Sequence, residues 1–557
     1  MDYTISYNPA TGKEIAKYQR NTKEEVIEAI KKSKAASKLW SQTPVKQRIK
    51  AIKNVQRYLI DNYKEVAKAI CDDNGKLLID SFVAEVFPAI MATSFYTKYA
   101  KKWLKPKNLK GNSILTFNKK AYMVYSPYGV IGIISPWNYP FSIPFSEVVM
   151  AILAGNGVIL KVATETIHVG NILNKAFEAA KLPDGLFSYV NSSGPDTLDA
   201  FIEGSIDKIF FTGSVETGLK IQQAAAKKLI PTVLELGGND AAIVLKDCDI
   251  DKATWGIIWG GYTNSGQSCG GAQRILVDKS IYDQFCEKIK EKVTNLRPPK
   301  VPYNETIGDA DIGFITSKTQ KETVIKQIVE SIEKGAILYG ISYLPEDLEK
   351  QILTEDERKD YIIKVRSSKS EALKFLNKLL QVNNNFLPAM VLTDIKEDMP
   401  IFNDEIFGPV IGITYFEDIE QAINMANDSK LGLTSSVWTS NIKEGKKIAS
   451  KIEVGVVMIN DHLMSHGLAH TPWGGVKLSG IGRTHGEDGF YEMLSKKVII
   501  SDSLTFAKKQ LWWHPYSKII WDGMVGAMKF LYHKSLKEKF DGLKKLFKLL
   551  NRFFEKN

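Results

Sequence analysis

Between residues 130 and 236, short apolar runs alternate with stretches whose apolar positions recur at helical spacing. The apolar runs are VIGIIS, GVILK, FSYVN, DKIFF and TVLEL. Such runs, without polar alternation, are typical of strands that are buried on both faces of a parallel sheet. Helices between the runs would cover the two faces, so the pattern predicts an α/β fold of the dinucleotide-binding type.

The chain before this region predicts a strand pair followed by helices. Residues 3–18 alternate around a turn cluster at residues 8–12, which indicates two short strands. Thr22 is followed three places later by Glu25, which is the spacing of a capping box. We therefore expect a helical region that begins here and reaches about residue 104.

The remaining pattern predicts a hairpin and a second α/β segment. Residues 113–125 have two apolar arms around the polar residues 118–120, and the segment from Gly237 to about residue 480 again alternates strand and helix patterns. A chain of 557 residues is too long for one compact core. Two or three domains are expected.

The net charge of +11 is concentrated at the C-terminus. Residues 501–557 contain twelve Lys or Arg against five Asp or Glu, so the rest of the chain is close to neutral. A nearly neutral body does not favour nucleic acid as a partner. Hydrophobic content of 44% with 25% charged residues is ordinary for a globular protein.

The four cysteines, Cys71, Cys248, Cys269 and Cys286, have the spacing of neither a disulfide framework nor a zinc site. The N-terminal residues contain no apolar leader segment, and no uninterrupted apolar run approaches the ~20 residues that span a bilayer. We expect a reducing compartment and a cytoplasmic location.

Residues 234–274 concentrate the chemistry of the chain. Cys269 lies in a loop of Gly, Ser, Asn and Gln, where nothing bulky shields the backbone, so a substrate and a second reagent can both approach its thiol. Glu235 ends an apolar run and precedes two glycines, where a carboxylate can be desolvated enough to act as a base. The pair predicts a nucleophile and a base.

These residues carry a resemblance to a known family. Glu235-Leu236-Gly237-Gly238-Asn239, followed by Asn264-x-Gly266-Gln267-x-Cys269 and Arg274, resembles the paired active-site signatures of the NAD(P)-dependent aldehyde dehydrogenase superfamily. The resemblance runs from about residue 5 to about residue 500. It implies a Rossmann-like dinucleotide-binding domain, an α/β catalytic domain and a small β-hairpin arm that joins subunits into a homodimer or homotetramer.

The resemblance also implies domain boundaries. These are 1–108 with 128–236 for the dinucleotide-binding domain, 237–480 for the catalytic domain, 109–127 with 488–503 for the oligomerisation strands, and 504–557 for a tail. Within the catalytic domain, about 341–385 exceeds the usual family length. Leu344, Leu348 and Ile352 recur there at helical spacing, and we interpret the stretch as a surface insertion, with a partner-binding role as the alternative.

Three residues carry the chemistry that the resemblance implies. An aldehyde carbon must become tetrahedral before it can release hydride, and the Cys269 thiolate would make it so. Asn138, in the segment Pro136-Trp137-Asn138, matches the family asparagine that helps to form the oxyanion hole. Glu235 would activate the water that hydrolyses the resulting thioester.

The cofactor implied is NAD or NADP. Ser214 opens a helix after a strand, where backbone amides can meet a pyrophosphate, and Glu405 and Phe407 match the ExFGP segment that holds the nicotinamide ribose and ring. The full predicted set is Ser135, Pro136, Trp137, Lys161, Thr164, Gly213, Ser214, Glu405 and Phe407.

Two positions depart from the family pattern near Lys161, the lysine that matches the adenosine-ribose contact. The usual proline after it is Val162, and the glutamate often found three places on is Thr164. A glutamate there would repel a 2′-phosphate, so threonine makes NADP admissible. Glu165, the next residue, keeps the question open.

Substrate residues are predicted from side-chain size. Tyr139 and Trp473 suggest an aromatic, apolar tunnel, and Ser142 and Ser146 lie on one helix where larger groups would narrow it. We expect a medium- or long-chain aliphatic, or an aromatic, aldehyde. The alternatives are a semialdehyde dehydrogenase, a relative that passes the acyl group to coenzyme A, and an inactive binding scaffold on the same fold.

Three histidines, His462, His466 and His470, stand four residues apart and invite a metal interpretation. Gly467 interrupts the helix that such a site needs, and no carboxylate or thiol motif accompanies the histidines. We therefore predict no metal site, and the resemblance places this stretch at the substrate entrance.

The tail beyond residue 504 predicts an amphipathic helix. Its apolar positions alternate spacings of four and three, and its basic positions lie on the other face. The apolar positions are Leu536, Phe540, Leu543, Phe547, Leu550 and Phe554. Such a helix can lie in the surface of an anionic membrane, or it can pack on its own oligomer, and the pattern leaves both open.

Overall fold

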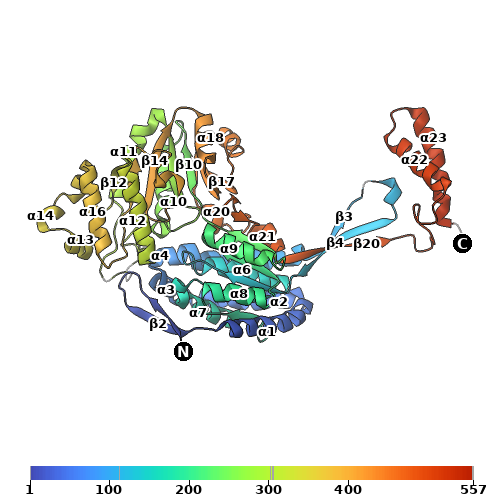
Figure 1. Ribbon diagram of the computed structural model, residues 1–557, viewed down its shortest axis with the longest axis horizontal. Helices are drawn as coiled ribbons and strands as arrows, with labels where there is room; N and C mark the ends of the chain where they lie inside the picture. Colours follow the sequence, from blue (N-terminus) through green and yellow to red (C-terminus); the bar gives the residue numbers. More distant parts are fainter. Residues whose placement is uncertain (1, 112, 302, 304–306, 555–557) are drawn as a thin grey trace. The chain divides into compact units, whose positions relative to one another are not determined.

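The protein is described by a computed structural model that covers residues 2–111, 113–301, 303 and 307–554 (Figure 1). Contacts divide the chain into two compact units. The larger unit comprises Met1–Trp103 and Pro127–Ser495, and the smaller one Leu104–Ser126 and Lys496–Asn557. Of the predicted arm and tail, residues 112 and 555–557 lie outside the described residues.

The first sheet of the larger unit confirms the predicted α/β alternation. Its strand order is β19-β9-β8-β5-β6-β7, and β5 to β9 pair in parallel. The strands are β5 (Val130–Ile134), β6 (Gly157–Lys161), β7 (Phe187–Tyr189), β8 (Lys208–Thr212), β9 (Thr232–Glu235) and the antiparallel β19 (Gly480–Ile481). The strands β5 and β6 are wholly buried, which explains their unbroken apolar composition.

Helices cover both faces of this sheet, as Figure 1 shows for α1, α6, α8 and α9. These are α1 (Lys23–Gln42), α6 (Ser142–Ala154), α7 (Ile167–Glu178), α8 (Gly194–Glu203) and α9 (Val215–Ala226). The helix α1 begins with the predicted capping box, because the Thr22 hydroxyl accepts from the Glu25 N–H and the Glu25 carboxylate accepts from the Thr22 N–H. The predicted N-terminal strand pair is also present, as β1 (Tyr3–Tyr7) and β2 (Glu14–Gln19).

A long helical stretch before the first sheet has an unusual turn. It follows α2 (Val45–Asp61) and α3 (Tyr63–Asn74) and consists of α4 (Leu78–Ser81), the π-helical turn η1 (Phe82–Val86) and α5 (Phe87–Trp103). As a whole, Leu78–Trp103 has the length and composition of a membrane span. Since its inner face packs on α2 and α6 and carries the fully buried Glu85, we interpret it as a core helix.

The second sheet has seven strands in the order β12-β13-β14-β11-β10-β16-β17. They are β10 (Asp240–Val244), β11 (Ala272–Asp278), β12 (Ile337–Ile341), β13 (Met390–Thr393), β14 (Val410–Phe416), β16 (Thr434–Trp438) and β17 (Val456–Ile459). Its pairs are parallel except for the edge strand β12, which runs antiparallel to β13. Its helices include α10 (Ile250–Tyr262), α11 (Tyr282–Thr294), α12 (Lys318–Glu333), α18 (Ile419–Asn427) and α19 (Ile442–Ala449).

The long stretch at 341–385 forms four helices beside the edge strand β12. They are α13 (Glu346–Ile352), α14 (Glu355–Arg358), α15 (Tyr361–Ser367) and α16 (Lys369–Gln381), and they gather at one end of the second sheet in Figure 1. Leu344, Leu348 and Ile352 are buried in the same apolar core as the sheet. The stretch thus extends the core and caps the open edge of the sheet.

The smaller unit corrects the predicted hairpin. Its sheet order is β20-β4-β3, with β3 (Lys107–Leu109), β4 (Lys119–Pro127) and β20 (Leu494–Asp502). The first arm is therefore Lys107–Leu109 and not the residues just before Asn118. There the Ser113 hydroxyl accepts from the Leu115 N–H and closes a 3-10 turn, which keeps this segment out of the sheet.

The tail is a pair of helices rather than the single helix that the pattern predicted. The helices α22 (Lys518–Tyr532) and α23 (Leu536–Leu550) pack closely at two glycines. A Cβ on Gly542 would lie only 2.5 Å from the Gly526 carbonyl oxygen. The row Gly542, Leu546 and Leu549 is the buried one. The predicted stripe is instead largely exposed, with exposed fractions of 83% for Leu536, 60% for Phe540, 60% for Phe547 and 70% for Phe554.

Candidate active site around Cys269

Cys269 lies in a loop whose backbone packs tightly at Gly266. The loop follows α10, and its residues Asn264, Ser265 and Gly266 all have positive φ angles, of 55°, 56° and 70°. A Cβ on Gly266 would lie 2.0 Å from the Gly408 carbonyl oxygen, so only glycine fits there. The Cys269 side chain itself is partly accessible. Strained backbone of this kind is typical of functional sites.

The predicted oxyanion residue, Asn138, is tied to this loop. Its Nδ2 donates to the Gln267 carbonyl at 3.1 Å, and the Asn264 side chain donates to the Asn138 carbonyl at 2.9 Å. An amide nitrogen carries two N–H groups, so the second remains for another acceptor. Asn138 is therefore hydrogen-bonded to the loop at Gln267, which is two positions before Cys269 in the sequence.

A fully buried ion pair holds the Asn138 segment from the other side. Lys76 Nζ lies 2.5 Å from Glu85 Oε1 and donates to the Asn138 carbonyl at 2.8 Å. The second carboxylate oxygen of Glu85 accepts from the backbone N–H groups of Phe141 and Ser142 at 2.7 and 3.1 Å. The sequence analysis missed both residues. Their only signal was two opposite charges inside an apolar helical pattern.

Glu235 ends β9 and points into the protein interior. Its side chain is buried, and in the described part of the chain neither carboxyl oxygen has a hydrogen-bond partner. Burial raises the pKa of Glu235 well above its usual range, against the opposing charge of Arg483. Gly474 lies against it, since a Cβ there would be 2.8 Å from Glu235 Oε1. A buried, unpartnered carboxyl group is well suited to accept a proton.

The resting form of Cys269 is the thiol. Burial raises its pKa, and the nearby carboxyl groups of Glu405, Asp240 and Glu235 raise it further. A thiolate at this position therefore needs a proton acceptor close by. Glu235 is one of the three carboxyl groups that act on it electrostatically.

Cys269 opens onto a cavity of about 200 Å³, which we call the main cavity. Tyr139 and Trp473, two of the predicted substrate residues, line it together with Ser268. Further lining residues come from the stretch that the resemblance places at the substrate entrance, namely Leu463, Met464, His466 and Gly467. The lining residues that were not predicted are Asp80, Val83, Ala84, Pro88, Trp259 and Thr263. Asp80 is the acidic member of the lining, and burial raises its pKa to about 6. No Lys or Arg is among the described residues that line the cavity.

Ser142, the third predicted substrate residue, lies outside the main cavity. It lines a small adjoining hollow of about 10 Å³, which has room for about one water-sized group and which we call the side chamber, together with Ser146 and His485. The ring of His466 borders both spaces. It stacks on Tyr139 at a centroid distance of 6.1 Å and stands edge-on to Trp473 at 4.9 Å.

The three histidines at 462–470 do not share a helix, because α20 covers only Met464–Gly467. His462 is buried and its Nδ1 lies 2.8 Å from the Ser436 hydroxyl, whereas His470 lies near the Phe95 ring. No group of three or more metal-ligating side chains occurs among the residues that the structure describes. His466 is the one of the three that reaches the main cavity.

Several residues predicted to bind the cofactor meet near the Cys269 loop. The rings of Trp137 and Phe407 stand perpendicular with centroids 5.2 Å apart. Glu405 Oε1 accepts from the Gly238 N–H at 3.1 Å, and a Cβ on Gly237 would lie 2.2 Å from Glu405 Oε2. Burial raises the pKa of Glu405 to about 8. These contacts fix Glu405 against the segment that follows Glu235.

The other predicted cofactor residues lie at carboxyl ends of the first sheet. Ser135 and Pro136 follow β5, and in the described chain the buried Ser135 hydroxyl has no partner. Lys161 ends β6, and burial lowers its pKa while Glu165 opposes this. Thr164, three places on, is exposed.

The loop before α9 completes this edge. Gly213 donates its N–H to the Glu235 carbonyl at 3.0 Å, and Ser214 is the N-cap of α9. Ligands of open α/β sheets bind at the carboxyl ends of the strands, and helix N-termini bind phosphate. The Ser135 hydroxyl, which has no partner among the described residues, the buried Lys161 and the N-terminus of α9 lie at one edge and therefore fit a dinucleotide.

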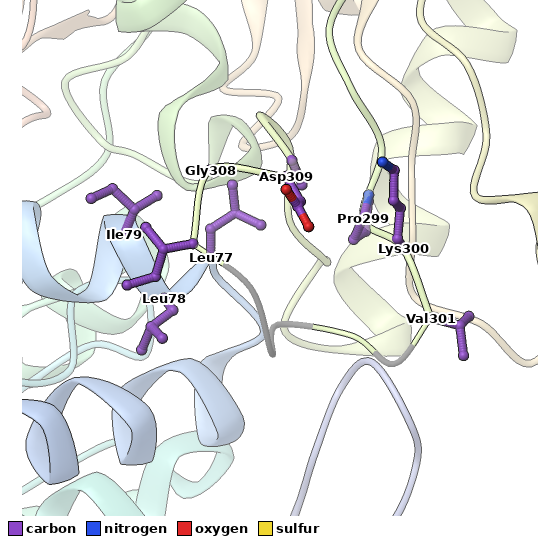
Figure 2. Close-up of a pocket in the computed structure, with 10 residues that line it drawn as sticks. Leu77, Leu78, Ile79, Pro299, Lys300, Val301, Gly308 and Asp309 are labelled. Carbon is purple, nitrogen blue, oxygen red and sulfur yellow. The ribbon is translucent and has the colours of Figure 1, made fainter.

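A second surface hollow, shown in Figure 2, lies between Leu77, Leu78 and Ile79 and the loop that carries Pro299, Lys300 and Gly308. Its lining contains none of the predicted catalytic, cofactor or substrate residues. We assign it no part in the chemistry.

A parallel sheet whose edge suits a dinucleotide, with a second α/β sheet beside a cysteine loop and a buried carboxyl group, is the architecture of a dinucleotide-dependent oxidoreductase. The sequence profile described as Aldehyde dehydrogenase family matches residues 2–355 and 352–499. The chain belongs to the aldehyde dehydrogenase family and is an enzyme that oxidises aldehydes.

Known relatives are similar over most of the chain. A 4,4'-diapolycopene aldehyde oxidase from Methylomonas sp is 30% identical over 96% of this chain and 92% of its own length. Benzaldehyde dehydrogenase YfmT from Bacillus subtilis (strain 168) is 31% identical over 88% of this chain and 92% of its own. A solved point mutant of betaine aldehyde dehydrogenase from Staphylococcus aureus, in complex with NAD+, has a TM-score of 0.79 at 26% identity, covering 92% of this chain and 96% of that one.

Proposed function

We propose that the enzyme oxidises an uncharged aldehyde with an extended apolar or aromatic body to the carboxylic acid, with NAD or NADP as hydride acceptor. The observation that carries this proposal is the lining of the main cavity. Tyr139, Trp259 and Trp473 supply aromatic surface, Val83 and Met464 supply aliphatic surface, and no cationic side chain is among its described lining. Apolar walls with few polar groups suit an apolar ligand.

The same lining argues against a semialdehyde that carries a carboxylate. Such a substrate needs a cationic partner for its second charge, because an unpaired carboxylate is costly to bury. The acidic group in the lining, Asp80, would repel it once ionised. Uncharged aldehydes avoid both costs.

The first step forms a bond between Cys269 and the substrate. The Cys269 thiol gives its proton to Glu235, and the sulfur adds to the carbonyl carbon. The carbonyl oxygen becomes an oxyanion, which accepts from the second N–H of the Asn138 side chain and from the Cys269 backbone N–H. Lys76 and Glu85 hold Asn138 in place for this contact.

Bound NAD(P)+ supplies the hydride acceptor, and loss of hydride leaves a thioester on Cys269. Glu235, after passing its first proton to solvent, takes a proton from a water molecule that attacks the thioester carbon. The carbon–sulfur bond breaks, the acid leaves and Cys269 regains its proton. The residues named for the cofactor are Ser135, Pro136, Trp137, Lys161, Thr164, Gly213, Ser214, Glu405 and Phe407.

The choice between NAD and NADP rests on the end of β6. Thr164 is exposed at the place where a carboxylate would repel a 2′-phosphate, and the exposed Glu165 follows it. We infer that both dinucleotides are accepted. Absorbance at 340 nm with each dinucleotide, across a panel of aliphatic, aromatic and semialdehyde substrates, tests the function and the preference together.

That panel also tests the rival functions. Fastest turnover of a two-carbon aldehyde or of a semialdehyde carboxylate would contradict the substrate proposal. Acyl-coenzyme A as the product would favour the acyl-transferring relative. Absence of NAD(P)H formation with every aldehyde would favour a binding scaffold, and turnover that survives Cys269→Ala unchanged would exclude Cys269 as the nucleophile.

We propose further that the helix pair α22–α23 binds the surface of an anionic membrane, where it would hold a cytoplasmic enzyme. Leu536, Phe540 and Phe547 are exposed on α23, and Trp521 is 71% exposed on α22. Lysines are interspersed along both helices, and the tail carries most of the excess positive charge. Exposed aromatic side chains together with basic ones are typical of interfacial helices.

Vesicle sedimentation tests this second proposal. Vesicles rich in phosphatidylserine should retain the enzyme, and Phe540→Ser with Phe547→Ser should release it, whereas Tyr3→Ser, an exposed aromatic in β1, should not. Unchanged binding of the double variant would contradict the proposal. A change of its oligomer size without an effect on vesicles would indicate that the helices pack on another subunit instead.

A further inference from the structure

The ring of His466 borders both the main cavity and the side chamber. Pro88, His466 and Gly467 line both spaces. His466 lies on the four-residue helix α20, between Leu463, whose φ is 68°, and Gly467. The ring is held by contacts with other rings, including His485 at a centroid distance of 4.8 Å. A short helix beside a glycine gives this ring freedom to turn.

The side chamber contains polar atoms that have no partner. The hydroxyl of Ser142 and Nδ1 of His485 are both buried, and neither has a hydrogen bond to any described residue. Buried polar groups are nearly always satisfied, and leaving one unpaired costs about 1–3 kcal/mol. Two such groups in one hollow next to a substrate cavity indicate that another molecule supplies their missing hydrogen-bond partners.

The chemistry of the chamber is neutral. Burial lowers the pKa of His466 to about 4 and the pKa of His485 well below its usual range, so both rings are uncharged at neutral pH. The described lining contains no Lys, Arg, Asp or Glu, and Ala92 contributes a small apolar wall. A charged group would find no counter-ion there.

We propose that the side chamber is a subsite for a neutral, oxygen-bearing substituent of the aldehyde, such as a hydroxyl group. When His466 turns aside, this substituent forms hydrogen bonds with the Ser142 hydroxyl and with Nδ1 of His485. The inference rests on the proposed function, since it assigns part of that substrate. It adds that the enzyme distinguishes among apolar aldehydes by an oxygen atom away from the reacting carbonyl. A chamber that only holds water would give no such preference.

Matched aromatic aldehydes test the subsite. Steady-state kcat/KM is measured for benzaldehyde, for its 3-hydroxy and 4-hydroxy derivatives and for 4-carboxybenzaldehyde. The enzyme should prefer at least one hydroxylated aldehyde by about tenfold and should disfavour the carboxylated one. Ser142→Ala should reduce that preference to below about threefold. Ser142→Val, which fills the space, should act selectively on the hydroxylated substrate.

Ser81→Ala is the matched control, because Ser81 is also a buried serine but donates to the Leu77 carbonyl outside the chamber. It should leave the preference unchanged. Equal kcat/KM for all hydroxylated and parent aldehydes, or a preference that survives both Ser142 variants, would overturn the subsite while benzaldehyde oxidation still supports the proposed function. Failure to oxidise any aldehyde would instead contradict the proposed function. Thermal unfolding identifies a variant that has not folded.

Discussion

Lys76 Nζ lies 2.5 Å from Glu85 Oε1, and the side chains of both residues are fully buried. The pair is joined to the site through the backbone, because Lys76 donates to the Asn138 carbonyl and Glu85 accepts from Phe141 and Ser142. A buried pair of this kind contributes little net stability, although breaking it is costly. Its position suggests that it orients the asparagine amide.

Replacing Lys76 by Met should therefore reduce catalysis more than substrate binding. We expect kcat to fall about 10²-fold, comparable to the loss of one oxyanion donor, with little change in the KM for the aldehyde. The free energy of unfolding should fall by about 3–5 kcal/mol, since Glu85 is left without its partner. Kinetics and urea unfolding measure the two effects.

Alkylation of Cys269 distinguishes a loss of Asn138 orientation from general damage to the active site. Alkylation of Cys269 by iodoacetamide forms no oxyanion, so its rate in folded Lys76→Met should stay within about threefold of the parent enzyme. Lys220→Met, which removes an exposed ion pair with Glu216, is the control and should change neither kcat nor stability. An equal loss of alkylation and turnover would show that Lys76 has no specific effect on Asn138.

Glu235→Gln should slow the formation of the thioester and prevent its hydrolysis. The glutamine can take a proton neither from the Cys269 thiol nor from water, so the first hydride transfer should be slow and the thioester, once formed, should persist. Rapid mixing should show at most one NAD(P)H formed per Cys269, followed by turnover at least about 10²-fold slower. Denatured mass spectra should carry the acyl group. Cys269→Ala should give neither, and steady turnover of Glu235→Gln would contradict the role of this carboxyl group.

Glu147 should make stability depend on pH. Burial raises its pKa to about 8 from the usual 4.5, so between these values the folded state binds more protons than the unfolded state. The loss of folding free energy caused by the raised pKa of Glu147 is therefore absent below about pH 4.5, grows as the pH rises and is complete above about pH 8. Glu147→Gln should consequently gain a few kcal/mol of unfolding free energy relative to the parent between pH 5 and pH 8.

Urea unfolding at both pH values measures this difference. Glu24→Gln, an exposed carboxylate of α1, is the control and should show no pH-dependent gain. A gain of Glu147→Gln that is the same at pH 5 and pH 8 would mean that the effect comes from packing and not from ionisation.

The edge strand β20 should join two copies of the chain. It lies at one end of the order β20-β4-β3, and Val498, Ile499 and Ile500 are 51%, 37% and 65% exposed. An apolar strand with an open edge pairs readily with another chain. Ile500→Lys should shift a homodimer or homotetramer to smaller species in light scattering, whereas Val301→Lys, an exposed apolar residue elsewhere, should not. An unchanged mass for Ile500→Lys would place the interface elsewhere.

Local patterns predicted the parts of the site that are close in sequence. The buried strands β6 and β9 end at Lys161 and Glu235, and Ser135 directly follows β5. Unbroken apolar runs indicate such strand ends directly. The glycine-rich surroundings of Cys269 likewise follow from the steric limits of the loop. These features depend on a few neighbouring residues, so the sequence contains them.

Features that depend on distant packing were not predictable in this way. Lys76 and Glu85 meet only because a π-helical turn rotates Glu85 inward, and no short pattern specifies that turn. Ser142 was assigned to the substrate cavity from its size, but the ring of His466 lies between them. In the tail, the glycines of α22 and α23 select a different buried row from the one that the apolar spacing favours.

The contact of Gly266 with the Gly408 carbonyl has a consequence for engineering. Gly408 directly follows Phe407 and lies three residues after Glu405, so the loop that carries Cys269 rests on the segment before β14 that would bind the coenzyme's ribose. Redesigning residues 405–407 to change coenzyme preference would displace the reactive atom as well. Altered selectivity and altered reactivity should therefore arrive together, unless compensating changes in the cysteine loop are selected at the same time.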